Sequence, residues 1–171
     1  MFAARFVKAL SAVALFNGVL YFSLAPDVAS ANHEEDAKRY TQELRKNKDA
    51  KAKVNALNEL GKLASLQKSL VADALPDIYK ALEDKDAKVR AAAAQCLGAC
   101  DEPADKAIPA LLKILKDDKE DAARIGATKG LASMGPGAKS ALPTLRELAK
   151  DKTSPVGKAA KAALKAIVQK N

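Results

Sequence analysis

Tryptophan is absent from this sequence, histidine occurs once, and aromatic residues make up only 4% of its 171 positions. All four phenylalanines lie within the first 22 residues, and beyond them the only aromatic residues are Tyr40 and Tyr79. The sequence also lacks runs in which β-branched or aromatic residues alternate with polar ones, the pattern typical of strands. These absences argue against a sheet protein, and they leave few of the aromatic side chains that anchor tight interfaces.

Groups suited to catalysis are scarce as well. The single histidine, His33, lies before the repetitive part of the chain, so no Ser–His or Cys–His pair is expected inside the fold. A zinc site that uses histidine is excluded for the same reason. Glycine-rich loops that cradle phosphates are missing, and we interpret residues 135–137, Gly-Pro-Gly, as a turn. The sequence therefore predicts no catalytic residue, no metal and no cofactor.

Two cysteines, Cys96 and Cys100, are four residues apart and fall on the same side of one predicted helix. Their side chains would run nearly parallel, which is unfavourable for a disulfide. Both also occupy positions where other copies of the repeat carry apolar residues such as Leu131 and Met134. We therefore interpret them as small buried hydrophobic residues, with a redox or metal role as the alternative.

The first thirty residues have the pattern of an export signal. Arg5 and Lys8 give a positive start, residues 9–26 carry no charge, and residues 29–31, Ala-Ser-Ala, supply a cleavage site just before Asn32. We predict a signal peptide over residues 1–31. The alternative is a retained membrane anchor formed by residues 9–26. Either way residues 32–171 would work outside the cytoplasm, in the periplasm or as a secreted protein.

Internal repetition is the strongest signal in the chain. A triplet of Ala, then Leu or Ile, then Pro recurs at offsets of 33 and 34 residues, as residues 74–76, 107–109 and 141–143. Each triplet opens a stretch with apolar residues three or four apart, and a cluster of charged residues follows. This pattern predicts a helix followed by a tight turn.

A second helix follows each turn, with apolar residues spaced along one helical face. The stripes are Val89, Ala93, Cys96, Leu97 and Cys100, then Ala123, Ala127, Leu131 and Met134, and then Val156, Ala160, Ala163, Leu164 and Ile167. A degenerate copy precedes them, because residues 48–51 match residues 85–88. The sequence predicts an all-α solenoid of about four stacked helical hairpins, with units at about 34–66, 69–101, 103–134 and 138–169.

This unit resembles a HEAT repeat, through the proline that opens the first helix and through Asp86, Val89, Arg90, Ala93 and Leu97 in the second. It is especially similar to the short HEAT-like repeats of phycobilisome-lyase-type bacterial proteins. The resemblance implies that the second helices line an inner, often concave, surface for partners. It also implies that Asp49 and Asp86 cap the second helices and bond the neighbouring unit. Arg90 and Arg124 match the family's arginine position, where the last copy has Gly157 and where Lys158 is a possible substitute.

Charge indicates the kind of partner. Loss of Arg5, Lys8 and Asp27 with the signal changes the formal net charge from +8 to +7, which favours an acidic partner. Nucleic acid is disfavoured, because the last 92 residues offer no aromatic side chain for base stacking. The membrane is reached only through residues 9–26, if they are retained.

We predict a non-catalytic scaffold that binds a protein partner along the polar side of the second helices. Two alternatives remain. One is a binder of an anionic ligand, which would be a lipid surface, an acidic polymer or nucleic acid. The other, which the resemblance suggests, is an accessory or lyase-like protein that handles bilins. The candidate binding residues are Asn55, Asn58, Lys62, Arg90, Gln95, Arg124, Thr128, Lys158, Lys161 and Lys165.

We expect the exported form to begin at Asn32, because signal peptidase accepts small residues at the spacing found in residues 29–31. Intact-mass measurement of the protein recovered from outside the cytoplasm checks this. A mass that still includes residues 1–31 would identify the segment as a retained anchor.

Overall fold

The computed structural model describes residues 15–16, 19–20, 28–100 and 102–169. Two short strands, β1 (Leu15–Phe16) and β2 (Val19–Leu20), pair antiparallel inside the predicted signal peptide. The rest of the described chain consists of helices joined by short turns, and the predicted all-α solenoid is confirmed. The predicted cleavage position after Ala31 falls in the first turns of α1 (Val28–Lys46), and most of the preceding segment lies outside the described residues.

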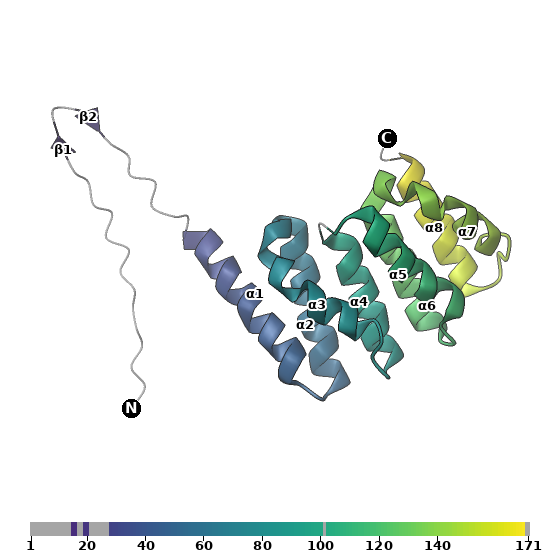
Figure 1. The fold of residues 1–171 in the computed structure, drawn as a ribbon. Coiled ribbons are helices and arrows are strands. Elements are labelled where there is room, and N and C mark those ends of the chain that lie inside the picture. Colours follow the sequence, from purple (N-terminus) through teal and green to yellow (C-terminus); the bar gives the residue numbers. More distant parts are fainter. Residues whose placement is uncertain (1–14, 17–18, 21–27, 101, 170–171) are drawn as a thin grey trace.

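The helices follow one another as four pairs (Figure 1). The pairs are α1 with α2 (Ala50–Leu66), α3 (Leu75–Ala81) with α4 (Ala87–Ala99), α5 (Ala104–Asp117) with α6 (Asp121–Met134), and α7 (Leu142–Leu148) with α8 (Pro155–Gln169). Short 3-10 helices, η1 (Lys68–Ala74) and η2 (Gly135–Ala141), lead into α3 and α7.

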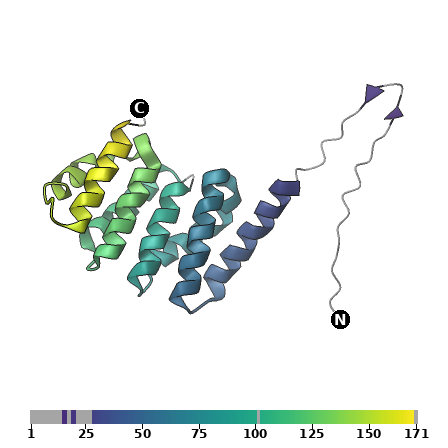
Figure 2. The same cartoon turned by 180° about the vertical axis from the view of Figure 1, so that it is seen from behind.

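Continuity of the stack comes from the second helix of each pair. Figure 2 shows α2, α4, α6 and α8 as a row, and each packs directly on the next. The first helices contact one another much less, since α3 and α5 are separated by a groove. The solenoid is therefore one layer of closely packed second helices with a looser layer of first helices over it.

The core lies between these two layers. Leucines of the second helices, such as Leu60, Leu97 and Leu131, have no exposed surface, and neither do Ile78, Leu111 and Leu145 of the first helices. Val89 and Ala127 are fully buried and Leu164 is partly buried, as the predicted stripes require. One pair could not bury its apolar face alone, so each pair depends on its neighbours for a dry core.

The helix starts follow from local sequence. Asp49 accepts a hydrogen bond from the backbone N–H of Ala52 (2.9 Å) and Asp86 one from that of Lys88 (2.8 Å), so both cap a second helix. Proline lies in the first turn of α3 and of α7, where its missing N–H has no cost. In the third pair Pro109 lies inside α5, because that helix begins earlier, at Ala104.

The closest approach between second helices occurs where α4 meets α6. A Cβ added to Gly98 would overlap the backbone of Gly130, and one added to Gly126 would lie 2.5 Å from the Cα of Ala91. Because the side chain of glycine is a single hydrogen, the two helix backbones can come into contact at these positions. This contact allows dense packing along the whole junction. Ala93, Ala127 and Ala160 are also fully buried, but the glycines set the separation of α4 and α6.

We predict that Gly98→Ala destabilises the protein by about 1–3 kcal/mol, because the new methyl group would meet rigid backbone and not a movable side chain. Urea unfolding followed by circular dichroism measures the change. Gly137→Ala is the matched control, because an added Cβ there has nothing within 4 Å. Equal stabilities for the two variants would contradict the proposed close contact.

Candidate functional site

The row of second helices presents one continuous exposed side, seen in Figure 2. We call it the second-helix face. Equivalent positions can be counted from the residues just before α2, α4 and α6, which are Asp49, Asp86 and Glu120, and from Thr153, which lies two residues before α8. At the ninth position the four helices carry Asn58, Gln95, Lys129 and Ala162, of which only Gln95 is half-buried and the others are exposed. Lys51 and Lys88, near the helix starts, and Lys62 and Ser133, near the helix ends, extend the exposed face.

Several predicted binding residues lie on this face. Asn58 and Lys62 are exposed on α2, where Lys62 pairs with Glu59 at 2.7 Å. Gln95 is half-buried on α4, and its side-chain amide donates a long hydrogen bond (3.3 Å) to the carbonyl of Ala91. Asn55 is also exposed, but it is equivalent to Gly126, which faces the preceding helix, so it lies on the side of α2 away from α4.

Thr128 lies elsewhere than predicted. Its side chain is only 1% exposed, and its hydroxyl donates a hydrogen bond of 2.8 Å to the carbonyl of Arg124. Thr128 is equivalent in position to Ala94, which packs against the following helix, and its burial excludes it from the exposed polar side. The neighbouring Lys129 occupies the face instead, and sequence reasoning missed it. Alignment with Asn58 and Gln95 at the ninth position would have found it.

Arg90 is also placed differently, since it joins two units and does not point to solvent. Its guanidinium donates to both carboxylate oxygens of Asp118, at 2.6 and 2.8 Å, and to the carbonyl of Asp84 at 2.8 Å. The side chains of Arg90 and Asp118 are 16% and 8% exposed. Hydrogen bonding from Arg90 lowers the pKa of Asp118 below its usual value.

The same arrangement links the first two units. Lys53, at the position equivalent to Arg90, pairs with Asp84 at 2.5 Å. Burial alone would raise the pKa of Asp84, but the backbone N–H of Asp86 and the Lys53 ammonium outweigh it and leave the pKa lowered. The prediction that Asp49 and Asp86 bond the neighbouring unit is therefore corrected, because the turn residues Asp84 and Asp118 do so.

The last junction lacks this ion pair. Arg124 donates instead to the carbonyl of Leu115 (3.3 Å) and pairs with Asp121 (3.2 Å), both in its own unit. At Gly157, the position of the arginine in the last copy, a Cβ would overlap the carbonyl of Asp151, so the turn itself fills the space. Lys158 does not take over the missing contact, because its side chain is exposed.

The three lysines of α8 do not join Arg90 and Arg124 in one strip along the second-helix face. Lys158, Lys161 and Lys165 are exposed on the side of α8 that points away from α6, whereas both arginines are half-buried in contacts between or within units. The candidate binding residues thus fall into three groups. Some are exposed on the second-helix face, the three lysines are exposed on α8, and others, such as Arg90, make contacts inside the protein.

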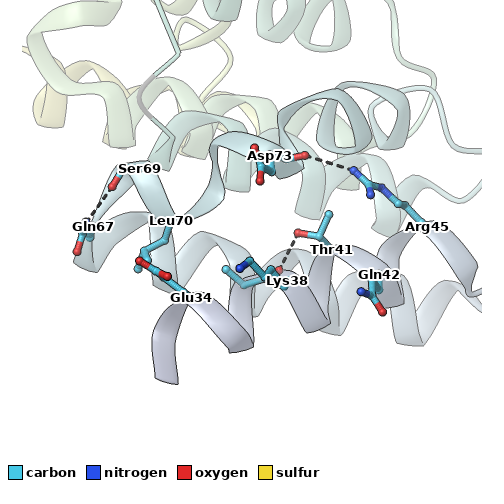
Figure 3. A pocket seen from close by; sticks show the side chains of 10 residues that line it. Glu34, Lys38, Thr41, Gln42, Arg45, Gln67, Ser69, Leu70 and Asp73 are labelled. Atoms are coloured by element: carbon cyan, nitrogen blue, oxygen red, sulfur yellow. Dashed lines mark hydrogen bonds between the residues drawn. The ribbon is translucent and has the colours of Figure 1, made fainter. Parts of the chain in front are cut away.

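A polar pocket of about 420 Å³ lies at the other end of the stack, between α1 and η1 (Figure 3). Three of its polar side chains form hydrogen bonds with other residues that line it. The Thr41 hydroxyl donates to the carbonyl of Ala37 (2.7 Å), the Gln67 amide donates to Ser69 (2.9 Å), and Arg45 reaches the carbonyl of Asp73 (3.4 Å). Arg45 also pairs with Asp77 at 2.7 Å. The two contacts of Arg45 fasten α1 to the second unit, and no group in the pocket is arranged as a nucleophile with a base.

A less polar groove of about 580 Å³ separates α3 from α5. Tyr79 lines it beside Leu82 and Ile114. The Tyr79 hydroxyl is buried without a hydrogen-bond partner, and burial, together with nearby Glu102, raises its pKa to about 12. The phenol therefore stays neutral and serves packing.

The remaining reactive side chains are also buried. Cys96 and Cys100 are free thiols, 2% and 8% exposed. A hydrogen bond with Cys100 and burial raise the pKa of Cys96 well above its usual range, which disfavours the nucleophilic thiolate. Among the described residues, no three His, Cys, Asp or Glu side chains are placed to hold a metal ion. None of the described helices is long and apolar enough to cross a bilayer.

Comparison with known families agrees with this geometry. A family model for HEAT repeats matches residues 37–132 and 108–170. No curated protein matches the chain in sequence. The resemblance to HEAT repeats is thereby confirmed, while the narrower similarity to phycobilisome-lyase-type proteins stays a prediction.

We predict that Asp118→Asn lowers the free energy of unfolding at pH 7 by about 1–3 kcal/mol, because it breaks a largely buried ion pair. The folded-state pKa of Asp118 lies below the ordinary 3.8, so this stabilisation is present above pH 3.8 and is lost as the pH falls through the folded pKa. Urea unfolding of both proteins at several pH values measures the difference.

Asp117→Asn is the control, because Asp117 is exposed beside Asp118 and has no ion pair among the described residues. A stability difference for Asp118→Asn that stayed constant down to pH 2, or an equal effect in the control, would contradict the structural role of this pair.

Proposed function

Since this chain belongs to the HEAT-repeat family, whose stacked helices generally form scaffolds for protein interaction, we propose that it is an exported, non-catalytic scaffold that binds a protein partner along the second-helix face. Export rests on the signal pattern of residues 1–31 alone. The binding role rests on the geometry and chemistry of the second helices.

One observation carries the proposal, namely the alignment of Asn58, Gln95 and Lys129 across three neighbouring helices. The core and the junctions between units use the other sides of these helices. Within the described part of the chain, the aligned side chains form no hydrogen bond or ion pair that joins one unit to the next, and Gln95 makes only a weak hydrogen bond to its own helix. Their polar groups are thus available to a partner.

The chemistry of the face favours a partner rich in hydrogen-bond acceptors. Amide groups of Asn58 and Gln95 can both donate and accept, whereas the ammonium groups of Lys51, Lys88 and Lys129 only donate. Large aromatic anchors are missing from the face, so we expect modest affinity together with a dependence of the association rate on ionic strength.

The decisive experiment is affinity capture from the native envelope fraction, followed by reconstitution with the purified candidate partner. We expect Gln95→Glu/Lys129→Glu to weaken binding about tenfold or more, because it replaces donors in the middle of the face with negative charge. Lys113→Glu/Lys116→Glu is a control on the first-helix side, and it should bind like the wild type.

Two results would overturn the proposal. One is an equal loss of binding in both variants, which would indicate an effect of net charge alone. The other is capture only of an anionic polymer or lipid, with binding that weakens steeply as salt rises. That second result would support the anionic-ligand alternative.

A further inference from the structure

Each second helix offers a fixed set of positions to the helix that follows it. In α4 these positions hold Ala91, Ala94 and Gly98, which lie against Gly126 and Gly130 of α6. Ala91 and Ala94 are at most 9% exposed and Gly98 is buried. Small side chains are needed there, because the next helix packs directly onto them.

The equivalent positions in α8 are Lys158, Lys161 and Lys165, all exposed. Val168 continues the same stripe and is 53% exposed, whereas its counterpart in α2, Ala64, is 1% exposed. Arg146 of α7 stands where Tyr79 and Leu112 pack in the two preceding units, and it too is exposed. We call this surface, Arg146, Lys158, Lys161, Lys165 and Val168, the end face.

Polar residues on the end face would keep a further unit from stacking there. That role does not explain why all the charged residues of the end face are positive. At the opposite end, the side of α2 that points away from α4 carries Asn55 and Glu59, and Glu59 pairs with Lys62 of the same helix. Near the end face, Asp151 interacts with Lys158, since its pKa is lowered by Thr153, by the backbone of Ser154 and further by Lys158. Among the described residues no ion pair reaches Lys161, Lys165 or Arg146.

Lysines three and four residues apart on one helix repel one another and lower its stability slightly. A neutral polar cap would avoid this repulsion. The cationic stripe therefore loses stability in the free protein, and carboxylates brought by a partner would restore it.

We propose that the end face binds an acidic helix of a partner protein, with carboxylates opposite Lys158, Lys161 and Lys165. The shape supports a helix, because α2, α4 and α6 each receive a following helix, and the contacts of α2 and α4 are at these same positions, Gly61 in α2 and Ala91, Ala94 and Gly98 in α4. Val168 and the half-buried Leu164 supply apolar contact beside the charges. This surface is separate from the second-helix face, so the inference does not rest on the proposed function.

A helix fits the end face better than a lipid bilayer does. Stable membrane binding needs apolar side chains that insert between lipids, and Val168 is the one large apolar side chain exposed by more than half on this surface. The three lysines also lie in single file along α8, which matches one row of carboxylates on a helix and not a broad plane.

The test uses a stapled, fluorescein-labelled helical peptide of Ala and Leu, with Glu at positions i, i+4 and i+7, and fluorescence anisotropy with the full chain. We expect Lys158→Ser/Lys161→Ser/Lys165→Ser to bind about tenfold more weakly than wild type, since three exposed ion pairs are lost. Lys113→Ser/Lys116→Ser/Lys139→Ser removes the same charge elsewhere and should bind like wild type. Circular dichroism confirms that each variant is folded.

A charge swap makes the test specific. Lys161→Glu/Lys165→Glu should lose the glutamate peptide and gain a matching peptide with Lys at the same positions. Equal weakening in the control triple variant would overturn the proposal, since binding would then follow net charge. So would absence of peptide binding combined with binding to vesicles containing phosphatidylserine. Variants of Gln95 and Lys129 on the second-helix face should leave peptide binding unchanged. A failure of the end-face proposal can therefore be told apart from a failure of the proposed scaffold function.

Discussion

Direct contact between the backbones of neighbouring second helices is the constraint on which the structure depends. Gly98 and Gly130 bring α4 and α6 so close that a methyl group would not fit between them. This approach lets alanine, otherwise a small contributor to a core, become fully buried at Ala93 and Ala127. A chain with so few large aromatic residues can then form a dense interior, because packing density and not side-chain size supplies the dispersion contacts. The separation of the helices in turn fixes which side chains remain outside.

Charged residues have three different roles, although their sequence patterns look alike. Lys53 and Arg90 lie at equivalent positions, and each ties its own unit, the first and the second, to the acidic turn of the unit that follows. Lys129 and Lys88 are exposed on the second-helix face. The lysines of α8 occupy the stacking positions of the last described helix, where they are exposed. Solenoid symmetry explains this division, because a position that joins two units in the middle of the stack becomes solvent-exposed at its end.

The candidate site was only partly predictable for the same reason. A helical period separates the apolar stripe from the polar side, and it placed Asn58 and Gln95 on the face correctly. It gives little information about the flanks of the helix, where neighbouring units pack. Thr128 therefore looked like a surface residue, although α8 covers it, and Lys129 was overlooked. Arg90 looked like a contact for a partner, although Asp118, 28 residues later, occupies its guanidinium.

The sequence by itself determined the helical class, the pairing of helices and the direction in which each apolar stripe faces. These features depend on local periodicity and on residues such as Asp86 and Pro76, which act within one helix turn. Only the tertiary structure decided which polar side chains are free. That outcome depends on the distance and rotation between successive units, set by contacts such as Gly98 with Gly130 and by ion pairs between residues far apart in the chain. The local sequence pattern carries no information about such distances. Residues that connect units, residues of the second-helix face and residues of the end face therefore become distinct only once the units are stacked.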